Sequence, residues 1–424
     1  MHKSSPQSIV HSRWLLLLAL LLAGGQGLAA EETTSEEQPQ DWPVTIAQLR
    51  QQLYRMPGHA HTRQQLAIAL NNHAISLSNQ GQYLEAEQYL EEAMRTDGGN
   101  AQFKQNLIAI HLQEAQAAYQ AKRLNDARAS LTEALALDPS NAQANVLLGE
   151  IEYNSQRLKE AQRAWEAAVA GDPSLTDVAE KLARLKQELP VESKLERISQ
   201  AYFDIRYTDG LARETGFDLR DMLLDARRQV GTDFQYWPKQ KLVVLVYSNE
   251  EFRRVRQDMP EWVAGQYDGK IRARLPDKEL DPVTARRTLV HEYTHALVFE
   301  IAGMGCPIWF NEGLAEYESL KGQIPPWLLL RKAIMTNRVT PWSDLSNQFS
   351  MTAPAEQVTL AYEQSHSIVR YLVERYGFWR IRRILKALAV DTPFEQVLAG
   401  ECHLPLNRLE AQWRKWLEET LAKS

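Results

Sequence analysis

A helical segment that occurs three times constrains the fold of the first half of this chain. The three copies begin at Gly81, Lys122 and Gln156, and each continues through alanines to an aspartate. The second and third copies are 34 residues apart, which is a spacing typical of stacked helical hairpins. The first two are 41 residues apart. The seven additional residues make two helical turns, so they can lengthen a helix without rotating its apolar face much.

The region from Arg63 to Leu185 resembles tetratricopeptide repeats. In such repeats small alanines lie where the two helices of a hairpin approach closely, and the Asp138-Pro139 and Asp172-Pro173 pairs would each end one hairpin and start the next. The resemblance implies an all-α array at residues 61–190 with a concave surface that binds peptides or proteins. The alternative is an array that only packs against the rest of the chain.

A second feature is the run 291–295, which reads H-E-Y-T-H and contains H-E-x-x-H. Histidines four residues apart lie one turn apart on one helix face, so His291 and His295 can hold one metal ion together. Glu292 points into the same site, where it can take a proton from an attacking water. Apolar residues at 289–290 and 296–298 predict that this helix is buried.

The segment after this helix supplies a candidate third ligand. Glycines at 303 and 305 predict the end of the first helix, and residues 307–318 are typical of a second helix that contains Glu312. A catalytic zinc site often uses two histidines and one glutamate and keeps a fourth position for water. Glu316 is one turn after Glu312, where it can orient a ligand histidine through its other ring nitrogen. The spacing predicts one zinc ion per chain, although other divalent ions can bind such ligands.

The H-E-x-x-H run followed by Trp309-Phe310-Asn311-Glu312-Gly313-Leu314-Ala315 resembles the gluzincin metallopeptidases of the peptidase MA-like group. The resemblance covers residues 242–417 and implies an α+β zincin-like metallopeptidase domain, which we expect at residues 196–424. It implies zinc ligands His291, His295 and Glu312 and the catalytic base Glu292.

The resemblance also implies a tyrosine that stabilises the oxyanion. Residues 361–372 resemble the helix that carries this tyrosine in aminopeptidase-type gluzincins, which assigns the role to Tyr362. The sequence departs from that pattern at Gln364-Ser365, where those aminopeptidases usually have Lys-Gly. His366 is one turn from Tyr362 and is a second candidate for the same role, with a purely structural histidine as the alternative.

The two resemblances together imply a zinc-dependent peptidase whose repeat domain docks a partner or substrate. One alternative is a catalytically inactive zincin-like adaptor that binds proteins through its repeats. The other is a structural zinc protein, but a closed zinc site needs a fourth protein ligand, and no Cys or His is spaced to supply it.

Residues 262–275 are typical of a hairpin or an edge strand that follows a buried strand at 241–247. In related zincins an edge strand before the active-site helix pairs with extended substrate. The resemblance assigns this role to the strand that contains Gly269, Lys270, Ile271 and Arg272. A strand without substrate contact is the alternative, since strand addition needs exposed backbone groups.

The chain contains two cysteines, Cys306 and Cys402. Exported proteins enter an oxidising compartment, where the two can form a disulfide that ties the loop before Glu312 to the C-terminal segment. Two separate thiols are the alternative, because sequence does not give the distance between them.

Residues 1–30 are typical of an export signal, with a basic start, an apolar run at 14–23 and a small-x-small pattern at 27–29. They predict a periplasmic or secreted protein without stable membrane insertion after cleavage, and an uncleaved anchor is the alternative. Residues 31–60 are expected to form a leader and linker. The net charge of −6 gives no sign of nucleic-acid binding, which requires a basic surface.

Overall fold

The computed structural model describes residues 41–208, 213–256, 265–267, 269–274, 281–350, 352–390 and 392–422. The described chain forms two compact units, which meet in the sequence between Leu189 and Pro190. The predicted export signal at residues 1–30 lies outside the described residues and stays a prediction.

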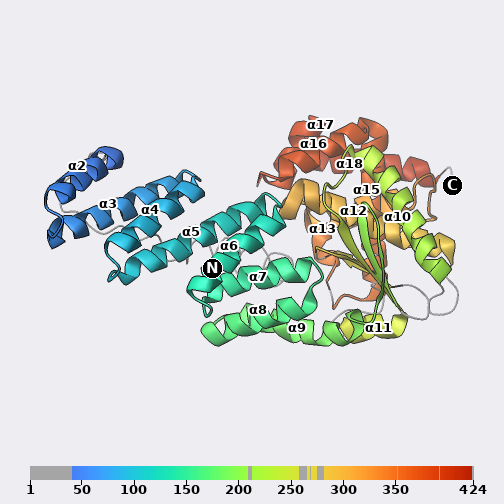
Figure 1. The fold of residues 1–424 in the computed structure, drawn as a ribbon. Helices are drawn as coiled ribbons and strands as arrows, with labels where there is room; N and C mark the ends of the chain where they lie inside the picture. Colours follow the sequence, from blue (N-terminus) through green and yellow to red (C-terminus); the bar gives the residue numbers. More distant parts are fainter. Residues whose placement is uncertain are drawn as a thin grey trace. The chain divides into compact units, whose positions relative to one another are not determined.

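The first unit consists of antiparallel helices that follow one another in pairs (Figure 1). They are α2 (Trp42–Arg55), α3 (Ala60–Asn79), α4 (Tyr83–Thr96), α5 (Ala101–Gln120), α6 (Leu124–Leu137), α7 (Ala142–Asn154), α8 (Leu158–Gly171) and α9 (Thr176–Glu192). Extensive contacts join α3 to α4, α5 to α6 and α7 to α8. The predicted stack of helical hairpins is therefore confirmed.

The unequal spacing of the repeats comes from a longer helix, as the sequence predicts. Helix α5 contains 20 residues and α7 contains 13, so the seven additional residues lengthen α5. The alanines of the pattern, such as Ala86 and Ala127, are completely buried between the paired helices. Side chains of successive first helices also meet, because Asn106 Nδ2 donates to Asn71 Oδ1 at 2.7 Å.

Both ends of the repeat region differ from the sequence prediction. Helix α2 lies within residues 31–60, which were expected to be a leader and linker. The Asp41 side chain accepts a hydrogen bond from the Val44 amide at 3.2 Å, and Ile46 is buried in the core of the first hairpin. At the other end, α9 runs past the expected boundary at residue 190 to Glu192, since a proline in the last turn, here Pro190, removes only one backbone hydrogen bond.

The second unit has a five-stranded sheet with the order β1-β2-β3-β5-β4. The strands are β1 (Glu196–Ser199), β2 (Phe203–Tyr207), β3 (Leu242–Tyr247), β4 (Gly265–Tyr267) and β5 (Ile271–Arg274). Strand β3 is parallel to β2 and β5, whereas β1 and β4 are antiparallel to their neighbours. The helices are α10 (Arg213–Phe234), α11 (Asn249–Val255), α12 (Pro282–Ala302), α13 (Ile308–Ser319), α14 (Leu328–Met335), α15 (Ala355–Tyr376), α16 (Phe378–Leu388), α17 (Phe394–Cys402) and α18 (Leu406–Leu421), with short 3₁₀ helices η2 (Gly303–Gly305) and η3 (Trp342–Gln348). This architecture agrees with the expected α+β domain.

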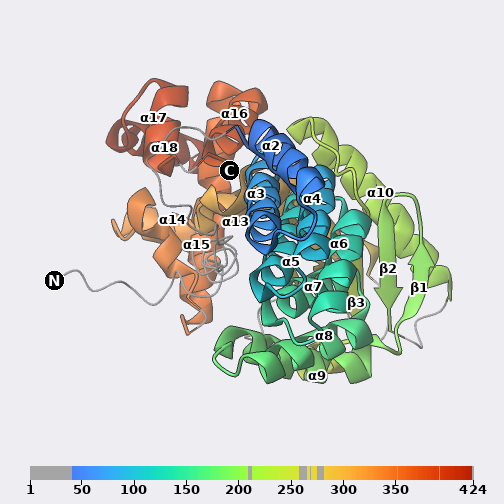
Figure 2. The same cartoon turned by 60° about the vertical axis from the view of Figure 1, so that its left-hand side comes forward.

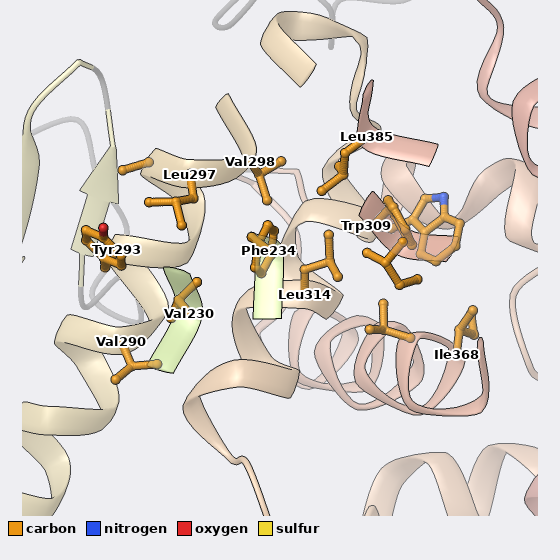
Figure 3. Close-up of a cluster of buried hydrophobic side chains, with 14 of the residues drawn as sticks. Val230, Phe234, Val290, Tyr293, Leu297, Val298, Trp309, Leu314, Ile368 and Leu385 are labelled. Carbon is orange, nitrogen blue, oxygen red and sulfur yellow. The ribbon is translucent and has the colours of Figure 1, made fainter. Parts of the chain in front are cut away.

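Alternate residues of the strands face two different cores. Val244 and Val246 of β3 face the larger core, whereas Leu245 and Tyr247 face a smaller core that includes residues of α11. Helix α10 lies beside β2 (Figure 2). Figure 3 shows side chains of the larger core, to which α10, α12, α13, α15 and α16 contribute the labelled residues Val230, Phe234, Val290, Tyr293, Leu297, Val298, Trp309, Leu314, Ile368 and Leu385. This core fixes α12 and α13 against each other, and these are the helices that the sequence predicts to carry a metal site.

The prediction of a substrate-binding edge strand at Gly269, Lys270, Ile271 and Arg272 is wrong, because the first two lie in a bend and the last two lie in β5. Strand β5 lies between β3 and β4, so both of its backbone edges are paired and β4 forms the edge of the sheet. The Arg272 side chain is completely buried in an ion pair with Glu192, and its Nη1 also donates to the Tyr247 hydroxyl at 2.5 Å. Its charge is therefore paired inside the unit and is not presented to a substrate at the surface.

The two cysteines are free thiols in the structure, which agrees with the alternative of two separate thiols rather than with the possible disulfide. Cys306 follows η2, with its sulfur 3.8 Å from the Pro307 carbonyl oxygen, and Cys402 is buried at the end of α17. Among the helices of the described ranges, none is both long and apolar enough to cross a membrane.

Candidate metal centre

Helix α12, which carries the H-E-x-x-H run, is largely buried and has a defined residue at each end. The Asp281 side chain accepts hydrogen bonds from the amides of Val283 and Thr284 at 3.2 Å each, and Pro282 occupies the first turn. The helix ends at Gly303, whose φ of 58° is a conformation that favours glycine. Its apolar residues join the larger core, so the polar side chains of the run are held on the remaining face.

The three predicted ligand atoms converge on one point. The Nε2 atoms of His291 and His295 each lie 3.4 Å from the same oxygen, Oε2 of Glu312. This separation is long for a hydrogen bond, and Glu312 Oε2 has no hydrogen-bond partner among the described residues. Ligand atoms about 2.1 Å from a tetrahedral zinc ion lie about 3.4 Å from one another. The two nitrogen–oxygen separations therefore match those expected in a tetrahedral zinc site.

The other nitrogen of each histidine ring is held by α13. Nδ1 of His291 lies 3.2 Å from Glu316 Oε1, as the sequence predicts. Nδ1 of His295 lies 2.9 Å from Oδ1 of Asn311, a partner that the sequence prediction missed. Ligand histidines in metal sites commonly use such partners, which fix both the ring orientation and the tautomer. Both Nε2 atoms are therefore directed to the shared point beside Glu312.

Glu292 lies beside the ligand atoms without being needed as a ligand. A ligand-type atom of its carboxylate lies within 4.8 Å of those of His291 and His295. The side chain is buried, and its Oε2 has no hydrogen-bond partner in the described part of the chain. Burial raises the pKa of Glu292 above its ordinary value. An unpaired carboxylate oxygen at this place is suited to receive a proton from a water in the same site.

Tyr362 of α15 lies at the same site, in agreement with the sequence prediction. Its ring centroid is 6.4 Å from that of His291. Burial and the nearby carboxylates of Glu312, Glu316 and Glu292 hold the pKa of Tyr362 well above 10. The hydroxyl is therefore protonated at neutral pH and can donate a hydrogen bond.

His366, the second candidate on α15, has a different environment. Its Nδ1 accepts a hydrogen bond from Nε1 of Trp327 at 3.0 Å, which leaves the ring proton on Nε2. Burial lowers the pKa of His366 to about 4, so the ring is neutral at pH 7. The bond to Trp327 gives His366 a structural role, and a catalytic role for His366 stays a prediction.

Gly313 allows the helix that carries Glu312 to lie against the helix that carries Tyr362. A Cβ atom at this position would lie 2.6 Å from the Ser365 carbonyl oxygen and 2.8 Å from Val369 Cγ2. Contacts below 3.0 Å require a shift, and the nearest atom belongs to a buried backbone, which cannot move easily. The absence of a side chain at residue 313 therefore allows α13 and α15 to approach each other closely.

The charged side chains of the site shift one another's pKa values. Burial acts to lower the pKa of His291, but Glu312 and Glu316 outweigh it and raise that pKa above 6.5. Burial acts to raise the pKa of Glu312, but His295 and His291 outweigh it and hold that pKa well below its usual range. Glu312 is therefore a carboxylate at neutral pH, which is the form that binds a metal cation.

Comparison with known families agrees with this geometry. A family model described as the peptidase MA superfamily matches residues 279–419, which include the H-E-x-x-H run, Glu312 and Tyr362. The chain contains a peptidase MA superfamily domain. A second family model, described as a tetratricopeptide repeat, matches residues 118–185 and precedes it, in the order that the sequence predicts. No curated protein matches the chain.

The residues that the sequence assigns to the peptidase MA domain thus divide into two groups. The structure brings together the side chains of His291, Glu292, His295, Glu312, Glu316 and Tyr362. Strand β5 is not an edge strand that could pair with a substrate, and the two cysteines are not paired with each other. Asn311 is the member that was missed, although it precedes Glu312 in the same motif.

Proposed function

We propose that this protein is an exported zinc metallopeptidase that hydrolyses peptide bonds. The observation that carries the proposal is that the Nε2 atoms of His291 and His295 each lie 3.4 Å from Oε2 of Glu312, with Glu292 beside the two histidines. The match to the peptidase MA superfamily supports it, because this superfamily is typically zinc-dependent. Export follows from the sequence prediction for residues 1–30.

Each side chain of the site has a separate task in this proposal. His291, His295 and Glu312 would hold the zinc ion, while Glu316 and Asn311 keep the two rings in place. Zinc in such a site polarises a substrate carbonyl and lowers the pKa of its water to about 7. Glu292 accepts the proton of the attacking water and passes it to the leaving amine. Tyr362 donates a hydrogen bond to the oxygen on which negative charge develops.

The repeat domain is proposed to bind a protein, either a partner or the substrate itself. The match of residues 118–185 to tetratricopeptide repeats supports this, because stacked helical hairpins form an extended concave surface.

Metal content tests the proposal directly. Elemental analysis of the purified full-length protein should give about one zinc per chain, and Glu312→Ala should lose it because a three-ligand site is left with two. Glu300→Gln is a matched control on α12, since Glu300 accepts a hydrogen bond from Tyr236 rather than facing the ligand atoms. A wild-type protein that binds no zinc would favour the inactive adaptor instead.

Tyr362→Phe should lower kcat by about 10²–10³-fold, which is the usual loss when one donor to an oxyanion is removed. The zinc content should stay the same, because Tyr362 is not a ligand, and the protein should remain slowly active. The measurement is kcat on a peptide substrate together with zinc analysis of the same sample. An unchanged kcat would remove Tyr362 from the proposed mechanism.

A further inference from the structure

Arg287 connects the protein surface to a ligand of the candidate metal centre. It lies on α12 one turn before His291, and its side chain is half-exposed. Its Nη2 donates a hydrogen bond of 2.9 Å to Oε2 of Glu316. The other oxygen of that carboxylate, Oε1, is the one that lies 3.2 Å from Nδ1 of His291. Three side chains therefore form one continuous chain of polar contacts that ends at a ligand ring.

The two oxygens of Glu316 have separate partners, and this division determines what Arg287 can do. A glutamate that holds a histidine through one oxygen can still rotate about its terminal bond, which has a broad torsional preference. A guanidinium group that donates to the second oxygen restricts this rotation, because a charge-assisted hydrogen bond holds that oxygen in place. With Oε2 held by Arg287, Oε1 stays in position for His291.

Arg287 also supplies positive charge to a carboxylate that is mostly removed from water. The Glu316 side chain is 15 % exposed, so an uncompensated charge there would be costly. His366 also lies close enough to interact with Glu316, but its ring is neutral because burial lowers its pKa to about 4. Arg287 is therefore the cationic partner of Oε2, the Glu316 oxygen that does not contact His291.

We propose that Arg287 is a positioning residue for zinc binding, which acts on His291 through Glu316. This inference depends on the proposed zinc function. It goes beyond that function because it assigns control of metal affinity to a half-exposed residue outside the ligand set. The neighbouring Arg286 provides a comparison within the same turn, since its Nη2 donates to Oε1 of Gln229 at 2.8 Å instead.

The test is the zinc dissociation constant of the full-length protein, measured by competition with a chelator of known affinity. R287Q should bind zinc about 10-fold more weakly, because loss of an outer partner of a ligand histidine costs about 10–100-fold in affinity. R286Q is the matched control and should keep the wild-type constant. R287K should fall between them, because lysine restores the charge but not the planar donor geometry. Thermal melting of each variant confirms that the fold is intact.

A double-variant cycle separates positioning from a general loss of stability. If Arg287 acts through Glu316, then R287Q should have little further effect on zinc affinity in an E316Q background. If the wild-type protein binds zinc and R287Q binds it equally tightly, the role of Arg287 is overturned while the proposed function stands. The same holds if the effects of R287Q and E316Q on zinc affinity are additive. A wild-type protein that binds no zinc would overturn the proposed function as well.

Discussion

Glu292→Gln should lower kcat by about 10²–10⁴-fold, which is the usual contribution of a positioned general base. The amide has nearly the same shape as the carboxylate but cannot accept the proton of the attacking water. The fold should be retained, because burial of a neutral amide costs less than burial of a charged carboxylate. The measurement is single-turnover hydrolysis of a peptide, with zinc content determined on the same preparation.

The zinc content of Glu292→Gln should equal that of the wild type, because Glu312 rather than Glu292 lies 3.4 Å from both Nε2 atoms. Glu300→Gln on the same helix is the matched control and should keep kcat within about twofold, since surface substitutions away from a site have small effects. Retained hydrolysis in Glu292→Gln would contradict the assignment of the base. Loss of zinc in that variant would instead show that Glu292 belongs to the ligand set.

The candidate site was predictable where local helix geometry determines it. The interval of four residues between His291 and His295 places both rings on one face, and the same interval relates Glu312 to Glu316. Asn311 could not be found in this way. Its contact with His295 depends on how α13 crosses α12, and adjacent residues on a helix do not share a face.

The substrate-binding strand was predicted wrongly because the alternation of apolar and polar residues along a strand does not reveal whether that strand lies at the edge of a sheet. Arg272 has the polar character of a surface residue in the sequence, but it is completely buried. Its partner Glu192 comes 80 residues earlier, at the end of a helix that begins in the repeats. A pairing over such a distance leaves no periodic signal in the chain. Whether Cys306 and Cys402 can form a disulfide likewise depends on the distance between them in the folded chain, which their spacing in the sequence does not determine.

Glu192→Ala should lower the free energy of unfolding of the second unit by about 3–5 kcal/mol, which is the usual cost of removing one partner of a buried ion pair. Glu192 and Arg272 are both completely shielded from solvent, and the Tyr247 hydroxyl also donates to Glu192, at 2.6 Å. The variant leaves the Arg272 charge in the interior without this partner. Denaturant unfolding followed by tryptophan fluorescence measures the change.

Two further variants show whether buried charge is the cause. Glu192→Leu combined with Arg272→Met should recover most of the lost stability, because apolar residues of similar volume can replace a buried ion pair at little cost. Arg228→Ala removes an exposed pair with Asp225 on α10 and should change the free energy of unfolding by less than about 1 kcal/mol. If Glu192→Ala has an effect as small as Arg228→Ala, Arg272 is stabilised by other contacts. If the double variant stays as unstable as the single one, the lost stability comes from packing around Tyr247 rather than from an unpaired charge.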